Sequence, residues 1–394
     1  MSWKTVALKD IGSIIGGGTP STSNAGNFGG DYPWITPRDL SRQKSRYISA
    51  GERGISKAGL AASSAKVLPA GTVLVSSRAP IGLTAIASFP VTTNQGCRSF
   101  VPGPDADSLF MYYLLSSMTG EFVRLANGST FKEISGSTLA AVEVSLPPLD
   151  EQRAIAATLG ALDDKIESNR RAIQLMEGLC RAHFDRLFDV SNNDEGVPLS
   201  RLFEVNPRRS LSSSQVGTYV GMASLPEFSA EIYNWEEKPA GSGQRFVNGD
   251  VLMARITPCL ENGKTAVVDM LDTGAVGWGS TEYIVLAPKG NIGTEWIYCL
   301  VRNEAIRTFA IVSMTGTSGR QRFQADRFDQ YKIARPPEAA LSEFNSLATP
   351  QFSRMTQLRD ETLDLLALRD ALLPELLSGR IRITEAEHLA DMER

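Results

Sequence analysis

The sequence predicts an α+β protein with two related globular domains, separated by two long helices that pair as an antiparallel coiled coil. Three observations support this fold class. The chain has 394 residues, which is too many for one ordinary hydrophobic core. Short blocks of the first half recur in the same order in the second half. After each half comes a stretch of about 38 residues with apolar heptad spacing.

The internal repeat covers half of the chain. The matching blocks are Gly71–Pro80 with Gly249–Pro258, Thr93–Pro102 with Gly279–Pro288, Gly128–Ile134 with Thr317–Phe323, and Pro147-Pro148 with Pro336-Pro337. The offset between partners drifts from 178 to 189 residues, as expected when the loops between matched strands differ in length. Each half is therefore expected to form one mixed domain followed by one helix, and the two domains to be related by a pseudo-two-fold.

The elements follow from local patterns. Short β-branched or apolar runs bounded by Gly and Pro predict strands at Val73–Ser76, Thr84–Ala87, Val251–Met253, Thr265–Val268 and Tyr283–Leu286. Longer apolar patterns predict helices, packed on these sheets, at Ser108–Arg124 and Thr294–Phe309. The predicted boundaries are 1–147 for the first domain, 148–190 for the central helix, 191–336 for the second domain, 337–380 for the C-terminal helix and 381–394 for a tail.

The two long helices carry a seam with steps of four and three residues. Its members are Ile155, Leu159, Leu162, Ile166, Asn169, Ile173 and Met176 in the central helix, and Met355, Leu358, Leu365, Leu372 and Leu376 in the C-terminal helix. Two such seams most economically bury each other, and antiparallel pairing is favoured because it puts the domains at opposite ends. Asn169 is expected to set the register of the pair. Pro350 is expected either to kink the second helix or to mark its true start.

Several classes of protein are excluded by what the sequence lacks. No run of 18 apolar residues predicts a membrane span, and Met1–Val6 lacks the pattern of a signal peptide, so a cytoplasmic protein is expected. Four scattered cysteines and two histidines predict no metal site and no nucleophilic catalytic group. A binding protein without catalytic residues and without a cofactor is therefore favoured over an enzyme.

Charge is spread unevenly along the chain. The net charge of −4 argues against a protein that simply coats nucleic acid. Residues 38–57 nevertheless carry six basic and two acidic side chains, and residues 302–335 carry seven and three. The helical stretches 150–167 and 358–375 each carry five acidic and two basic residues. Basic surface is therefore expected between the helices.

Basic, amide, hydroxyl and aromatic side chains in the predicted loops are the candidates for DNA contact. In the first domain they are Trp34, Thr36, Arg38, Lys44, Arg46, Ser77, Arg78, Asn94, Gln95, Arg98, Ser129, Thr130 and Lys132. In the second domain they are Arg208, Arg209, Gln244, Arg245, Arg255, Thr257, Trp278, Ser280, Thr281, Ser318, Arg320, Gln321 and Arg322.

These residue types suit nucleic acid, because Arg reads guanine, Asn and Gln read adenine, and Lys, Ser and Thr hold phosphates. Any single one is better explained as an ordinary solvated loop residue. The clusters 34–46 and 318–322 favour nucleic acid, because sign, residue type and placement agree. Two domains on a rigid rod would meet DNA at places roughly 34 Å apart. Since the halves differ in sequence, the expected target is bipartite and asymmetric.

Five motifs resemble a known family, the DNA-specificity subunit of type I restriction–modification systems. They are Leu146-Pro-Pro-Leu-Asp-Glu-Gln-Arg153 with the helix that follows, Tyr32-Pro-Trp-Ile-Thr-Pro-Arg-Asp-Leu40, Gly71–Pro80, Gly128-Ser-Thr130 and Leu372-Leu-Pro-Glu-Leu-Leu-Ser-Gly-Arg-Ile381. The second junction, Arg335-Pro-Pro-Glu-Ala-Ala-Leu341, lacks the Asp-Glu-Gln-Arg of the first. In the second domain, Val205-Asn-Pro-Arg-Arg209 is expected to stand where the first has its Trp34 loop.

The resemblance implies two target-recognition domains, helices that act as ruler and partner-binding surface, and no activity of the chain's own. It implies double-stranded DNA as a partner in a host-defence complex. Further partners would be two methyltransferase subunits, which carry S-adenosylmethionine, and up to two restriction subunits, which use ATP. The alternative is a protein–protein scaffold built on the coiled-coil rod, whose domains never touch nucleic acid. Salt-dependent DNA binding separates the two hypotheses.

Overall fold

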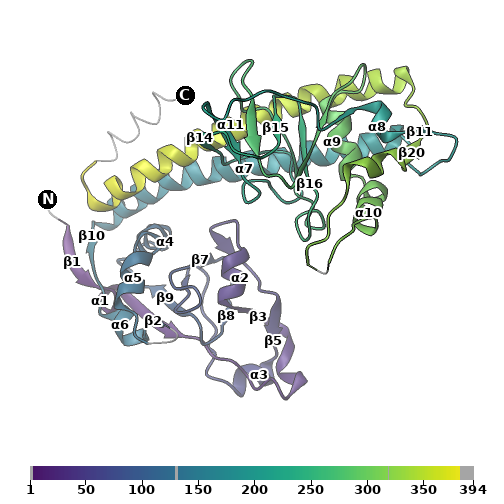
Figure 1. The fold of residues 1–394 in the computed structure, drawn as a ribbon. Coiled ribbons are helices and arrows are strands. Elements are labelled where there is room, and N and C mark those ends of the chain that lie inside the picture. Colours follow the sequence, from purple (N-terminus) through teal and green to yellow (C-terminus); the bar gives the residue numbers. More distant parts are fainter. Residues whose placement is uncertain (1–2, 129–131, 318, 382–394) are drawn as a thin grey trace. The chain divides into compact units, whose positions relative to one another are not determined.

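The computed structural model describes residues 3–128, 132–317 and 319–381 (Figure 1). It divides into two compact units, the first formed by Met1–Glu167 with Leu365–Arg394 and the second by Ser168–Asp364. Each unit contains β-sheets and helices, so the predicted α+β class is confirmed. Each long helix contributes to both units, because α7 spans Leu149–Leu187 and α11 spans Glu338–Ser378. The expected five-part division stays a prediction, and most of its tail, 382–394, lies outside the described residues.

Unit 1 is built on a five-stranded and a three-stranded sheet, with strand orders β2-β9-β6-β7-β4 and β5-β3-β8, and a separate pair β1-β10. Its strands are β1 Lys4–Ala7, β2 Gly12–Gly16, β3 Phe28–Ile35, β4 Tyr47–Ile48, β5 Arg53–Ile55, β6 Val73–Val75, β7 Thr84–Ala87, β8 Thr92–Thr93, β9 Arg98–Pro102 and β10 Glu143–Leu146. Its shorter helices are α1 Leu8–Ile11, α2 Pro37–Arg42, α3 Lys57–Ala61, α4 Ser108–Ser117, α5 Thr119–Leu125 and α6 Gly136–Ala140.

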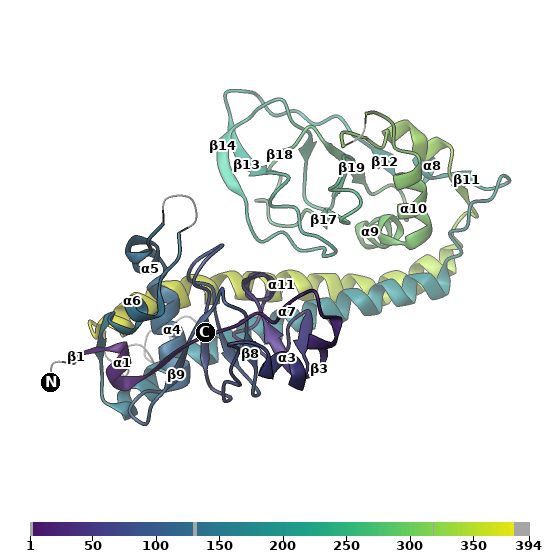
Figure 2. The same cartoon turned by 90° about the horizontal axis from the view of Figure 1, so that it is seen from below.

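Unit 2 has two four-stranded sheets, with orders β12-β19-β16-β17 and β14-β13-β18-β15, and the pair β11-β20. Its strands are β11 Val197–Pro198, β12 Glu204–Val205, β13 Val216–Val220, β14 Glu236–Pro239, β15 Arg245–Phe246, β16 Val251–Ala254, β17 Thr265–Val267, β18 Gly277–Gly279, β19 Tyr283–Ala287 and β20 Lys332–Ile333. Its shorter helices are α8 Leu199–Leu202, α9 Thr294–Arg302 and α10 Glu304–Val312. Figure 2 shows β13 and β14 at one side of this unit and the three short helices at the other.

The five predicted strands correspond to β6, β7, β16, β17 and β19, with ends that differ by at most one residue. The two predicted domain helices are each broken into two. The second break falls at Asn303, whose backbone is extended and whose side chain accepts a hydrogen bond from the Ala305 amide. Asn therefore ends α9 and caps α10, a local preference that the apolar spacing alone does not reveal. The first break falls at Met118.

Equivalent backbone hydrogen bonds confirm the internal repeat. The Ile134 amide donates to the Ser77 carbonyl at 3.1 Å, and the matched Phe323 amide donates to the Arg255 carbonyl at 2.8 Å. Likewise the Ser77 amide donates to Gly96, as the Arg255 amide donates to Glu282. The matched blocks therefore occupy the same places in two domains that share a core strand order, β2-β9-β6-β7 in the first and β12-β19-β16-β17 in the second.

One expected difference between the halves is wrong. In unit 1, Trp34 on β3 lies opposite Thr92 of the parallel strand β8, and in unit 2 Tyr219 on β13 lies opposite Trp278 of the parallel strand β18. The counterpart of the Trp34 segment is therefore β13. The segment 205–209 instead begins in β12, which pairs with β19 as β2 pairs with β9. The loop between β12 and β13 obscures this match in the sequence.

Both long helices are continuous. Since α11 begins at Glu338, the expectation that Pro350 marks its start is wrong. Proline is tolerated there because it is exposed, so water can bond the carbonyl group left without an amide partner. The alternative of a kink at Pro350 stays a prediction.

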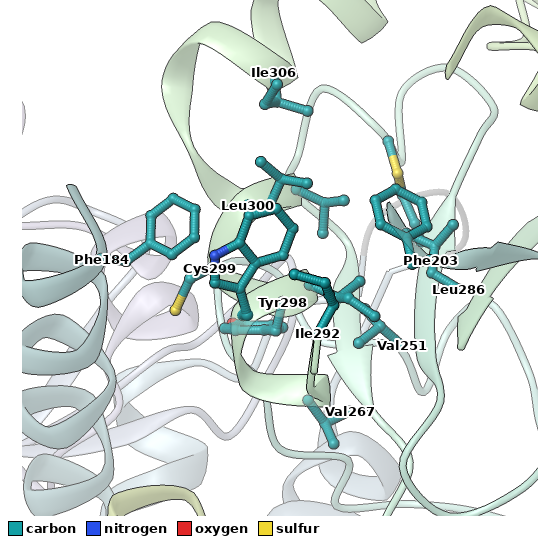
Figure 3. Close-up of a cluster of buried hydrophobic side chains, with 14 of the residues drawn as sticks. Phe184, Phe203, Val251, Val267, Leu286, Ile292, Tyr298, Cys299, Leu300 and Ile306 are labelled. Atoms are coloured by element: carbon teal, nitrogen blue, oxygen red, sulfur yellow. The ribbon is translucent and has the colours of Figure 1, made fainter. Parts of the chain in front are cut away.

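The predicted seam residues are largely buried. Ten of the twelve are buried, while Met176 and Leu365 are partly buried. In unit 1, Ile155 and Leu376 share one cluster with Phe110 of α4. In unit 2, Phe184 of α7 and Phe344 of α11 share a cluster with α9, and Figure 3 shows Phe184 beside this helix. The helices therefore bury their apolar faces against a domain as well as against each other.

Polar contacts fix the direction of the helix pair within each unit. In unit 1, Arg369 Nη1 lies 2.9 Å from Asp163 Oδ1. In unit 2, the buried Asn169 donates to Glu361 at 3.0 Å, and Arg186 pairs with Glu343. Within unit 2, Asn169 comes before Arg186 on α7, whereas the partner of Asn169 on α11, Glu361, comes after the partner of Arg186, Glu343. The two helix segments are therefore antiparallel. The register-setting role of Asn169 stays a prediction.

A buried charge cluster fastens the second domain to α11. The Arg359 side chain is 1% exposed and pairs with Asp269, and its Nη1 lies 3.7 Å from Glu231. Thr356 also donates to Asp269, at 2.6 Å. Burial raises the pKa of Glu231 to about 8, and the nearby Asp269 charge acts in the same direction. One guanidinium thus pairs with Asp269 and lies near Glu231, whose raised pKa favours its uncharged form.

Replacing Arg359 with Met is expected to lower the free energy of unfolding by about 3 kcal/mol, because the largely buried ion pair with Asp269 is broken. Chemical denaturation of the full chain measures this. The control is Arg354→Met, which changes an exposed arginine on the same helix and should alter stability by less than about 0.5 kcal/mol. Equal effects of the two substitutions would show that the Arg359 cluster does not hold the second domain on α11.

Candidate nucleic-acid interface

In the first domain, three candidate residues converge on one carboxylate. Glu133 accepts a hydrogen bond from Arg98 Nη2 at 3.0 Å and from Ser77 Oγ at 3.3 Å, and Arg78 Nη1 lies 3.7 Å away. Arg98 Nη1 also donates to the carbonyl groups of Gln95 and Cys97. Strand β9 and the segment after β6 thus present two arginines around an acidic side chain that is partly exposed.

In the second domain, a carboxylate again lies between two arginines. Arg322 donates hydrogen bonds to Glu282 from Nε and Nη2, at 2.9 and 2.8 Å. Arg255 Nε lies 3.2 Å from the same carboxylate. The hydrogen bonds from Arg322, together with the Arg255 charge, hold the pKa of Glu282 below its usual value. The cluster is therefore fully ionised at neutral pH.

The two clusters share part of their positions, and at one matched position the charge is reversed. The block alignment and the shared backbone bonds put Glu133 at the position of Arg322, and Gly96 at that of Glu282. In the first domain the acid follows the loop and the arginines lie on the sheet side. In the second domain an arginine follows the loop, and the acid immediately precedes strand β19. The two domains thus offer different chemistry on the same backbone.

Four candidate side chains are buried: Trp34, Arg46, Ser77 and Trp278. Trp34 Nε1 donates to the Gly18 carbonyl at 3.0 Å, and Arg46 pairs with Asp164 of α7 at 2.6 Å. Trp278 packs against Tyr219 at a ring separation of 4.5 Å. We therefore assign these four residues structural roles, since no buried side chain reaches a base edge. Residue type and neighbours could not reveal their burial.

Other candidates are partly buried and bonded within their own domain. They are Thr36, which caps α2, Asn94, which accepts from the Gly96 amide, Arg209, which pairs with Asp250, Arg245, which donates to the Gly241 carbonyl, Thr257, which bonds Glu261, and Ser280, which accepts from the Glu282 amide. Gln244 and Gln321 are also partly buried. These side chains shape the loops, and a contact with DNA would compete with their present bonds.

The remaining described candidates are exposed: Arg38, Lys44, Gln95, Lys132, Arg208, Thr281 and Arg320. Ser129, Thr130 and Ser318 lie outside the described residues. Lys132 and Arg320 flank the two matched loops, close in sequence to Glu133 and Arg322. Lys132 and Arg320 thus come from the same matched segments as Glu133 and Arg322, whereas Arg38, Lys44 and Arg208 lie outside the matched blocks.

The sequence reasoning missed the two carboxylates and two cation–aromatic pairs. Arg53 lies 4.0 Å from the Phe28 ring centre, and Lys238 Nζ lies 3.5 Å from that of Tyr219. A signal for the carboxylates was available, because Glu133 and Glu282 are the acidic residues of blocks already matched between the halves. In the part of the chain that the structure describes, no group of potential ligands is arranged for a metal ion, and no helix has the length and apolarity of a membrane span.

Comparison with known proteins gives the family. Residues 1–177 match the model described as the type I restriction modification DNA specificity domain. The chain is 31% identical to the MjaIX specificity subunit of Methanocaldococcus jannaschii, over 97% of this chain and 94% of that protein. This chain belongs to the specificity subunits of type I restriction enzymes. The resemblance inferred from the motifs is therefore confirmed.

Other members are similar over shorter or more divergent stretches. The HindI specificity subunit of Haemophilus influenzae is 32% identical over 43% of this chain and 38% of its own length. The crystal structure of the S subunit from M. genitalium has the same fold, with a TM-score of 0.60 and 16% identity over 95% of this chain and 96% of that one. The specificity-subunit fold is thus retained at low sequence identity.

Arg46→Leu is expected to lower the free energy of unfolding by about 2 kcal/mol, because it removes a buried guanidinium that pairs with Asp164 of α7. Lys44→Leu, two residues away and exposed, should change it by less than about 0.5 kcal/mol. Denaturant unfolding of both variants checks the structural assignment of Arg46. An Arg46 variant as stable as the Lys44 variant would contradict it.

Proposed function

We propose that this specificity subunit recognises a bipartite, asymmetric DNA target, one half with each domain. The observation that carries the proposal is the pair of Arg–Glu clusters at matched positions of the two domains. Each lies beside exposed cations that can hold phosphates, while the partly exposed arginines suit guanine in the major groove.

The asymmetry of the target follows from the different placement of charges in the two clusters. The first domain offers Arg78 and Arg98 from the sheet side, with Glu133 on the loop side. The second offers Arg322 after its loop, with Glu282 on the strand side. Because donors and acceptors are placed differently on one backbone, the two domains would prefer different base sequences.

Partner subunits would supply the chemistry. In this proposal the chain has no catalytic activity and holds no cofactor, and two methyltransferase subunits carry S-adenosylmethionine. Up to two restriction subunits, using ATP, would complete the complex. The partners would dock on the exposed faces of α7 and α11, since the seam side chains are buried. A location in the cytoplasm would follow from the chromosomal substrate.

In the complex with methyltransferase subunits, selection from a random duplex library is expected to yield two short sequence blocks separated by a fixed gap. Arg320→Ala should weaken selection in one block only, since this exposed arginine belongs to one domain. If Arg320 contacts a base, the substitution should cost about 1–3 kcal/mol of binding free energy. If it contacts a phosphate, the slope of log K against log salt concentration should become shallower by about one.

The matched control is Arg354→Ala, an exposed arginine on α11 outside both domain clusters, which should leave both blocks unchanged. A wild-type complex that binds every duplex equally would contradict the proposal and favour the protein–protein scaffold. If Arg320→Ala abolished selection of both blocks in a complex that still folds, the proposal that each domain reads one half-site would be contradicted.

A further inference from the structure

The positions of the Glu133 and Glu282 carboxylates are unexpected on a surface that binds DNA. A DNA-binding surface gains non-specific affinity from each uncompensated arginine, yet Glu133 and Glu282 each neutralise part of such a pair. Neither carboxylate is in a hydrophobic core, because their side chains remain 32% and 20% exposed. An acid in this place repels phosphate, so it opposes binding that depends on charge alone.

The carboxylates also orient the arginines. Glu282 accepts two hydrogen bonds from one edge of the Arg322 guanidinium, a bidentate arrangement that fixes the plane of the group. Arg255 donates to the same carboxylate through its Nε. A guanidinium with a fixed plane and a free edge is what discrimination of a base requires.

The two domains differ in how strongly this orientation depends on the acid. Arg98 is held by Glu133 and also by two backbone carbonyl groups, at 2.9 and 3.0 Å. Arg322 has a single additional bond, to the Arg320 carbonyl at 3.3 Å. Removal of the carboxylate should therefore release Arg322 more completely than Arg98.

We infer that Glu133 and Glu282 are positioning residues that raise specificity, each in its own half-site, by orienting arginines and suppressing charge-driven binding. This inference rests on the proposed function. It adds that two acidic side chains, which weaken overall attraction to DNA, are required for correct reading. It also adds that the second half-site depends on its carboxylate more than the first.

The test uses the assembled complex with methyltransferase subunits and compares Glu282→Gln, Glu133→Gln and wild type on cognate, half-mutated and random duplexes. The Glu282→Gln complex should bind random DNA more tightly. The slope of log K against log salt concentration should steepen by about 0.9 to 1.8, because up to two arginines are freed to contact phosphates. Discrimination by this complex at one half-site should fall about tenfold, with the other half-site unchanged. Glu133→Gln should affect the opposite half-site, by a smaller factor.

A double variant separates charge from orientation. Glu282→Gln with Arg322→Gln restores the net charge, so affinity for random DNA should return to the wild-type value while discrimination stays reduced. The control is Glu121→Gln, which makes the same charge change at an exposed pair with Arg124 on α5 and should alter neither half-site. Gln preserves the shape of Glu, and thermal unfolding of each complex checks that folding is retained.

The outcomes distinguish this inference from the function on which it rests. If wild type selects two blocks but Glu282→Gln leaves discrimination unchanged, or lowers it equally at both half-sites, the inference fails alone. If random-DNA affinity rises no more than in Glu121→Gln, the suppression of charge-driven binding is refuted. If wild type selects no sequence, the proposed function and the inference fail together.

Discussion

The core of each domain is completed by side chains that enter it from the two long helices. In unit 2, Phe184 of α7 and Phe344 of α11 lie in the same buried cluster as Trp296 of α9, and the rings of Phe184 and Trp296 meet edge to face at 5.6 Å. In unit 1, helix residues and α4 share a cluster in the same way. Because interiors are close-packed, neither domain can shift along its helix segment without opening cavities. The surface loops are thus carried on a rigid base.

On this base, chemical variety is confined to side chains around a repeated backbone. The amides of Ile134 and Phe323 make the same bond in the two domains, yet the residues just before them are Glu133 and Arg322. Exchange of an acid and a base at one place changes what a loop can recognise and leaves the sheet beneath it intact. This separation of scaffold from site would let one topology serve the two different half-sites that we propose.

The sequence predicted those features that depend on periodicity and repetition. The heptad spacing located both helices, and the matched blocks located the core strands, because burial imposes those patterns directly. Burial of individual loop residues could not be predicted, since Trp34 and Arg46 become structural only through distant partners, Gly18 and Asp164. The place of Glu282 in the cluster could not be predicted either, since its partner Arg322 lies 40 residues later in the chain.

The central claim is that two domains of one chain read two different half-sites. Mapping of methylated bases across the genome, in cells with the methyltransferase subunit and with or without this chain, tests it most directly. The account predicts one motif of two unlike blocks around a fixed gap, methylated only when this chain is present. A continuous motif, two identical blocks or methylation independent of this chain would contradict it.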